Sequence, residues 1–150
     1  MKIANTIFAY VLAVAVTYVL SVAFYTQQVI AKMAAIGAVY SPQQKIDTFV
    51  QNFLGLAFRD QPSLGMMLAV ALAIGFAVGF VVKRIIKPLA PVAYPVAGAA
   101  AVVALLVYIE GSVAGGGAGV IGGARDAVGL SLQGLAGFLG GAAFAFKRPR

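Results

Sequence analysis

RDAVGLSLQGLAGFLGG, residues 125–141, is the stretch that decides the fold of this chain. Written as a helix, it places five residues on one face because they recur at every fourth position: Arg125, Gly129, Gln133, Gly137 and Gly141. Small residues along a face let a second helix approach closely, and a buried amide can hydrogen-bond across the contact. The stretch therefore predicts a transmembrane helix that packs against another helix.

The composition of the whole chain places it in the membrane. Hydrophobic residues make up 62% of its 150 residues and charged residues only 10%, whereas soluble domains carry roughly a quarter charged residues. Four segments contain no charge, at about residues 3–25, 64–82, 91–109 and 127–146. The shortest would be about 28 Å long as a helix, close to the roughly 30 Å hydrocarbon core of a bilayer. We therefore predict an all-α membrane protein, with four transmembrane helices in a single domain over residues 1–150.

A fifth, amphipathic helix is predicted between the first two spans, at about residues 42–58. Ser41, Pro42 and Gln44 form a helix-start signature with the spacing of a capping box. The apolar residues that follow fall on one stripe, and polar residues occupy the rest of the surface. The stripe comprises Ile46, Phe49, Val50, Phe53 and Leu54. We expect this helix to lie on the outer membrane interface or to pack over the bundle.

Charged residues predict the orientation of the chain in the membrane. The net charge is +7, and most cations lie at the two termini and in the loop between the second and third spans: Lys2, Lys83, Arg84, Lys87, Lys147, Arg148 and Arg150. These three segments share one side of a four-span topology, and all four acids lie on the other: Asp47, Asp60, Glu110 and Asp126. The remaining cations fall mostly in the long first loop, which weighs less in the positive-inside rule. We expect both termini in the cytoplasm, in the inner membrane of a bacterium. The basic side is expected to contact anionic lipid headgroups rather than nucleic acid.

The absence of cysteine and histidine removes whole classes of chemistry. Disulfides, thiolate metal sites, iron–sulfur clusters and His-ligated metals or haem are excluded for this chain alone. Catalytic triads lack their histidine. We expect no catalytic residue, no cofactor and no metal ion.

Three charged residues flank the hairpin between the third and fourth spans. Glu110 ends the third span, and Asp126 stands at the start of the fourth, where a carboxylate favours the helix dipole. Arg125 is the expected partner of Glu110. Together with Asp126, these residues are predicted to form a structural ion-pair group at the membrane surface. An ion or proton site is the alternative interpretation, because acids near the membrane often serve transport.

Small residues also mark the other spans as packing helices. Gly75 and Gly79 form a GxxxG element in the second span, which indicates close packing without naming the partner. In the first span, Thr17 and Ser21 are expected hydrogen-bond partners for Gln133, with Gln133 of another copy as the alternative. The first pairing predicts a self-contained bundle, and the second predicts an oligomer axis.

These patterns support three functional hypotheses. The first is a non-enzymatic structural or accessory bundle that associates with itself or with a larger membrane complex through its small-residue faces. The second is a small channel or transporter whose path lies at a homo-oligomer axis, with Gln133 as its deep amide. The third is a lipid-acting intramembrane enzyme that uses Glu110 and Asp126 as paired carboxylates.

Overall fold

The computed structural model describes residues 2–58, 63–113 and 126–148, which form five α-helices and one short 3₁₀ turn and contain no strand. The elements are α1 (Lys2–Ala35), α2 (Pro42–Phe58), α3 (Leu64–Ile85), η1 (Lys87–Leu89), α4 (Ala93–Val113) and α5 (Ala127–Lys147). Four of the helices are long and apolar enough to cross a membrane, and α2 is the shorter helix between the first two of them. The predicted fold class is thereby confirmed.

The helix ends follow the capping residues of the sequence. At α2, the Ser41 hydroxyl accepts a hydrogen bond from Gln44 N (3.3 Å), and the Gln44 side chain accepts one from Ser41 N (2.8 Å), which is the expected capping box. Ser63 caps α3 by accepting from Met66 N, and Asp126 caps α5 by accepting from Gly129 N at 2.7 Å. These caps satisfy amide groups that a helix leaves unpaired at its start.

Helix α1 is longer than the predicted span. It contains 34 residues and ends at Ala35, and Gly37, two residues further on, has a φ of +91°, a left-handed conformation that glycine adopts without a steric penalty. At 1.5 Å per residue, α1 is about 51 Å long, well above the roughly 30 Å hydrocarbon core. The helix is therefore longer than the apolar layer is thick, and its polar residues Gln27, Gln28 and Lys32 lie in its last third.

The third span is shifted along the chain from its predicted bounds. Helix α4 begins at Ala93 rather than Pro91, because η1 and the following turn occupy the residues before it. Pro95 lies in the first turn of α4, where the missing amide hydrogen costs no helical hydrogen bond.

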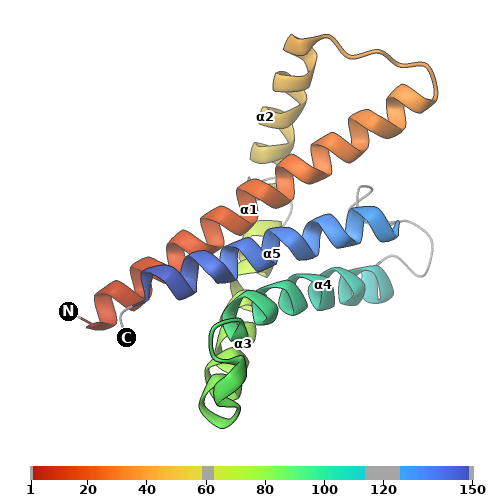
Figure 1. The fold of residues 1–150 in the computed structure, drawn as a ribbon. Helices are drawn as coiled ribbons and strands as arrows, with labels where there is room; N and C mark the ends of the chain where they lie inside the picture. The colour runs from red at the N-terminus through yellow and green to blue at the C-terminus, as the bar shows by residue number, and fades with distance from the viewer. Residues whose placement is uncertain (1, 59–62, 114–125, 149–150) are drawn as a thin grey trace.

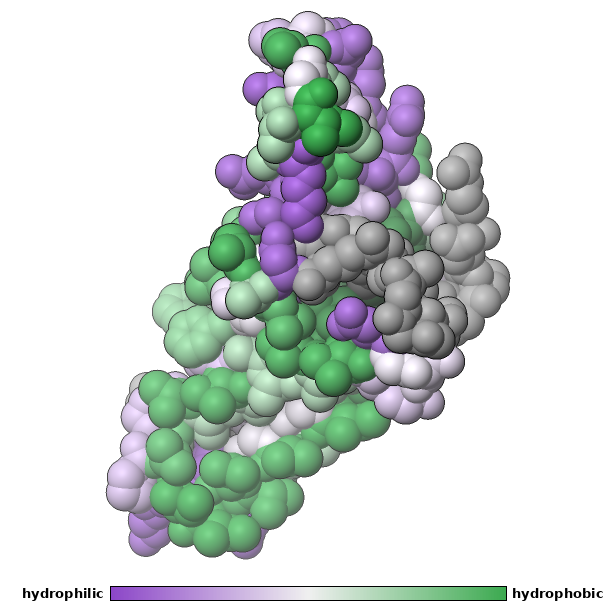
Figure 2. All heavy atoms as spheres, turned by 90° about the vertical axis from the view of Figure 1, so that its right-hand side faces the viewer, coloured by the Kyte–Doolittle hydropathy of each residue, from purple (hydrophilic) through white to green (hydrophobic). Residues whose placement is uncertain are grey.

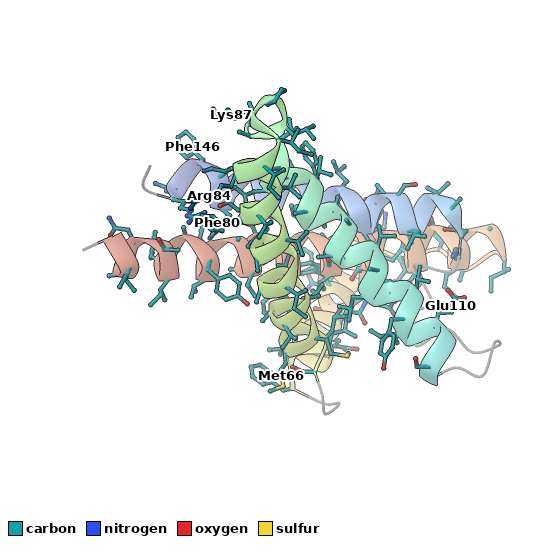
Figure 3. All side chains as sticks on the ribbon, turned by 90° about the horizontal axis from the view of Figure 1, so that it is seen from below. Met66, Phe80, Arg84, Lys87, Glu110 and Phe146 are labelled. Atoms are coloured by element: carbon teal, nitrogen blue, oxygen red, sulfur yellow. The ribbon has the colours of Figure 1, made fainter. Side chains whose placement is uncertain are left out.

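Helix α5 is central to the bundle. It lies between α1 and α4 and runs antiparallel to both (Figure 1). Helix α3 packs against α4 and crosses α1 and α5 steeply, as the view from below shows (Figure 3). The C-terminal half of α2 packs against the middle of α1, and the two helices diverge from that contact (Figure 1).

The two ends of the molecule differ in charge and polarity. The N-terminus, the C-terminal end of α5 and the α3–α4 turn lie at one end, which we call the basic end (Figure 1). Its described cations are Lys83, Arg84, Lys87, Lys147 and Arg148. The opposite end carries α2, the start of α5 and the end of α4. Hydrophilic side chains gather there over α2 and the neighbouring end of α1, above a mostly hydrophobic surface (Figure 2).

Candidate functional site

The contact between α4 and α5 is made by backbone against backbone. Added Cβ atoms show how close the helices are: one on Gly137 would clash with the Gly98 carbonyl oxygen and lie 2.7 Å from Val102 Cγ2. One on Gly141 would clash with the carbonyl oxygen of Tyr94. Only glycine fits at these positions, so the small residues fix how closely α4 and α5 approach.

The contact between α5 and α1 uses the amide of Gln133. The side chain of Gln133 is 4% exposed, and its Nε2 donates a 3.0 Å hydrogen bond to the backbone carbonyl of Ser21. Nearby, a Cβ on Gly140 would clash with the Thr17 hydroxyl and lie 3.0 Å from the Ala13 carbonyl oxygen. The row predicted from residues 125–141 therefore faces two helices: Gln133 meets α1, whereas Gly137 and Gly141 meet α4.

The hydroxyls of Thr17 and Ser21 do not bond to Gln133 as expected. Gln133 uses the Ser21 backbone instead, and within the described residues both hydroxyls are buried without a hydrogen-bond partner. Burying a hydroxyl unpaired costs free energy. The small side chains of Thr17 and Ser21 let α5 pack closely on α1, since larger side chains would hold the helices apart.

The GxxxG element of α3 packs on α4. A Cβ on Gly75 would lie 2.8 Å from Ala101 Cβ and 2.9 Å from the Ala97 carbonyl oxygen. A Cβ on Gly79 would lie 3.0 Å from Ala97 Cβ. Helix α4 therefore presents an alanine row to α3 and the Tyr94–Gly98 row to α5.

At the opposite end, Asp126 pairs with a cation that the sequence did not single out as its partner. Lys32 Nζ lies 3.2 Å from Asp126 Oδ2, which joins the end of α1 to the start of α5. The hydrogen bond from Gly129 N and the contact with Lys32 lower the pKa of Asp126 below its usual value. Gly129 is buried, and Glu110 is exposed near the end of α4. Arg125, the partner predicted for Glu110, lies outside the described residues.

Helix α2 is fastened to α1 through its aromatic stripe. The Tyr18 hydroxyl donates to the Phe53 carbonyl oxygen (2.5 Å), and the two rings meet edge to face at 5.1 Å. Asn52 Nδ2 donates to Thr26 Oγ1 at 3.0 Å. Phe49 is likewise partly buried against the core, while the other three stripe residues are exposed: Ile46, Val50 and Leu54.

An aromatic cluster near the basic end was not predicted from the sequence. Phe76 of α3 stacks on Phe144 of α5 with centroids 4.4 Å apart, and Tyr94 of α4 meets the Phe144 ring edge-on at 5.0 Å. The Arg148 guanidinium lies 5.1 Å from the Phe80 ring and 5.3 Å from the Tyr94 ring. Lys83 Nζ lies 5.4 Å from the same Tyr94 ring. One sequence feature could have indicated this cluster: aromatic residues stand near cations at the ends of three spans. Aromatic and basic residues often gather in this way at a membrane interface.

Besides a groove lined by Pro91, Pro95 and Arg148, two grooves on the described surface border α3. The first, of about 430 Å³, lies among α1, α3 and α5 next to the aromatic cluster, with Arg148 in its lining. The second, of about 620 Å³, lies between α3 and α4 and is lined by apolar side chains that include Met66, Val70 and Ile74. We call them the basic-end groove and the α3–α4 groove. In Figure 3, Met66 marks one end of α3, and Phe80 and Arg84 mark the other.

The chain matches no protein-family model, no curated protein and no solved structure.

Proposed function

We propose that this integral membrane protein is a non-enzymatic structural or accessory bundle, which works with copies of itself or as a subunit of a larger membrane complex. One observation carries the proposal: the amide and the small residues of the spans are used to join helices of the same chain. Gln133 bonds to α1, and Gly137 and Gly75 abut α4. Groups engaged in this way hold the bundle together and are not free to bind a substrate.

Association with another chain then uses surface outside the small-residue faces. The sequence suggested those faces as the means of association, but they are filled from within the chain. The α3–α4 groove offers an apolar hollow between two helices, where another transmembrane segment gains van der Waals contact. We assign association to this groove and its neighbouring apolar surface.

The two alternative functions have less support. A channel at an oligomer axis needs Gln133 to face a second copy, and its amide is bonded to Ser21 of the same chain. A lipid-acting enzyme needs Glu110 and Asp126 as a working pair. Asp126 is already engaged with the Gly129 amide and with Lys32, which holds it as an anion in a structural role.

We further propose that both termini face the cytoplasm of a bacterial cell, across its inner membrane. The grouping of five described cations at the basic end supports this orientation under the positive-inside rule. The polar helix α2 then lies on the outer side.

Replacing Gln133 with leucine tests the bundle against the channel. Native mass spectrometry of the wild-type protein in mild detergent is expected to give a mass above that of one chain, from copies or from a partner subunit. Gln133→Leu is expected to leave that assembly unchanged and to cost less than about 1.5 kcal/mol of stability, because the lost bond lies within one chain.

Ser131→Leu, at an exposed position of α5, controls for adding an apolar side chain to this helix. A smaller assembly for Gln133→Leu alone would show that the amides meet across an axis. A wild-type mass of a single chain would contradict the accessory role.

Cysteine labelling tests the orientation, because the chain has no native thiol. We expect Lys45→Cys in α2 to react with a membrane-impermeant maleimide in intact cells. The matched variant Lys147→Cys, at the basic end, is expected to react only after the cells are permeabilised. The reverse pattern would place the termini outside.

A further inference from the structure

We propose that the basic-end groove binds one anionic phospholipid, with an acyl chain along its apolar walls and the headgroup phosphate on Arg148. The proposal depends on the membrane fold and not on the accessory role proposed above. It assigns a ligand to a surface that the helix contacts leave open.

The groove has the walls that an acyl chain needs. Ile7 of α1 and Ala73 and Ala77 of α3 line it, and the rings of Phe76 and Phe144 close its inner side. Its volume of about 430 Å³ falls in the range of roughly 300–1,000 Å³ that small-molecule sites occupy. Alanines in α3 form a shallow trough here, because larger side chains at the same positions would fill it.

Arg148 stands where the headgroup would lie. Its guanidinium is held over the rings of Phe80, Tyr94 and Phe144, at 5.1 to 5.7 Å from their centroids. The ring faces attract the charge of the guanidinium without taking its N–H groups into conventional hydrogen bonds. Within the described residues, no salt bridge or hydrogen bond engages those N–H groups. The oxygens of a phosphate match this fork of donors, and phosphate is the anion that phospholipid headgroups carry.

The charge around the groove selects an anionic lipid over a zwitterionic one. Lys83 shares the Tyr94 ring with Arg148, and two more cations follow it at the basic end, Arg84 in α3 and Lys87 in η1 (Figure 3). The chain has no acid in residues 61–109 or 127–150, so no carboxylate of these segments neutralises the cations. A zwitterionic headgroup has no net charge for these cations to attract, whereas a net negative headgroup is attracted.

The groove residues offer a direct test by lipid titration. Native mass spectrometry of the detergent-solubilised protein is expected to show one phosphatidylglycerol bound about tenfold more tightly than phosphatidylcholine. Arg148→Gln is expected to remove about tenfold of this affinity, since it deletes the charged donor. Ala77→Leu is expected to weaken binding similarly by filling the groove, while it keeps every cation.

Matched variants separate the groove from general attraction to a basic surface. Lys147→Gln removes a neighbouring charge outside the groove lining, and Ala104→Leu places a leucine in the α3–α4 groove. Both are expected to bind phosphatidylglycerol as the wild type does. Equal loss in Lys147→Gln and Arg148→Gln would overturn the proposal in favour of diffuse attraction. Loss in Ala104→Leu alone, or full competition by glycerol phosphate without acyl chains, would also overturn it.

Discussion

Replacing Gly137 with leucine is expected to lower the free energy of unfolding by about 3 kcal/mol, the upper part of the usual range for overpacking. Even a single added methyl group meets the Gly98 backbone and Val102 Cγ2. Neither backbone can yield locally, because Gly98 and Gly137 both lie inside long helices. Helices α4 and α5 must therefore separate. Denaturation in mixed detergent micelles, followed by circular dichroism, measures the change.

Gly111→Leu is the matched control for this substitution. Gly111 is also a helical glycine of α4, but an added Cβ there meets nothing within 4 Å. The same change should leave stability equal or slightly higher, because leucine favours the helix more than glycine does. If Gly137→Leu were as stable as Gly111→Leu, the Gly137 face would have to lie against lipid.

Truncating Phe144 to alanine is expected to cost about 3 kcal/mol, near the lower limit for aromatic residues in a core. Phe144 is 5% exposed, and its ring stacks on Phe76 and meets the edge of Tyr94. In a membrane the loss comes from missing van der Waals contacts rather than from exposure to water. The cavity would join three helices at one point, so α3 is expected to loosen from α5. Protection of α3 amides from hydrogen exchange should fall along with stability.

Phe146→Ala controls for the loss of a ring from the same helix. Phe146 lies two residues further on and is 85% exposed, so its removal should change stability little. An equal loss in both variants would mean that the cluster adds nothing beyond the apolar content of α5.

Local features of the fold could be predicted from the sequence because they depend on neighbouring residues. The four spans follow from uninterrupted apolar length, and the start of α2 follows from Ser41 and Gln44, whose reciprocal bonds need no tertiary contact. Asp126 as a helix cap is local in the same sense. The charge difference between the two ends also follows from the sequence, because four spans place the basic segments on one side and the acids on the other.

The partner of each helix face could not be predicted in this way. Residues four apart on a helix of 3.6 residues per turn drift by about 40° at each step, so Gln133 and Gly141 point about 80° apart. One row therefore meets both α1 and α4. Gly98 lies in an alanine-rich run, so the sequence does not single it out as a contact for Gly137. Tyr94, Gly98 and Val102 do recur at every fourth position, but that spacing does not identify the partner helix. The pairing of Lys32 with Asp126 needs both the extra length of α1 and its place beside α5.

The central position of α5 sets the order in which the bundle can be completed during synthesis. A chain is made from its N-terminus, so α5 is made after the four α-helices that precede it. Until then, α1 has no Gln133 to bond with Ser21, 112 residues earlier in the chain, and α4 has no Gly137 to meet Gly98. Until α5 is inserted, the first three spans therefore form an incomplete bundle in the membrane. The small-residue faces of α1 and α4 that later contact α5 are then covered by lipid. A ribosome that stops before residue 127 leaves a chain whose helices are inserted but whose bundle is not closed.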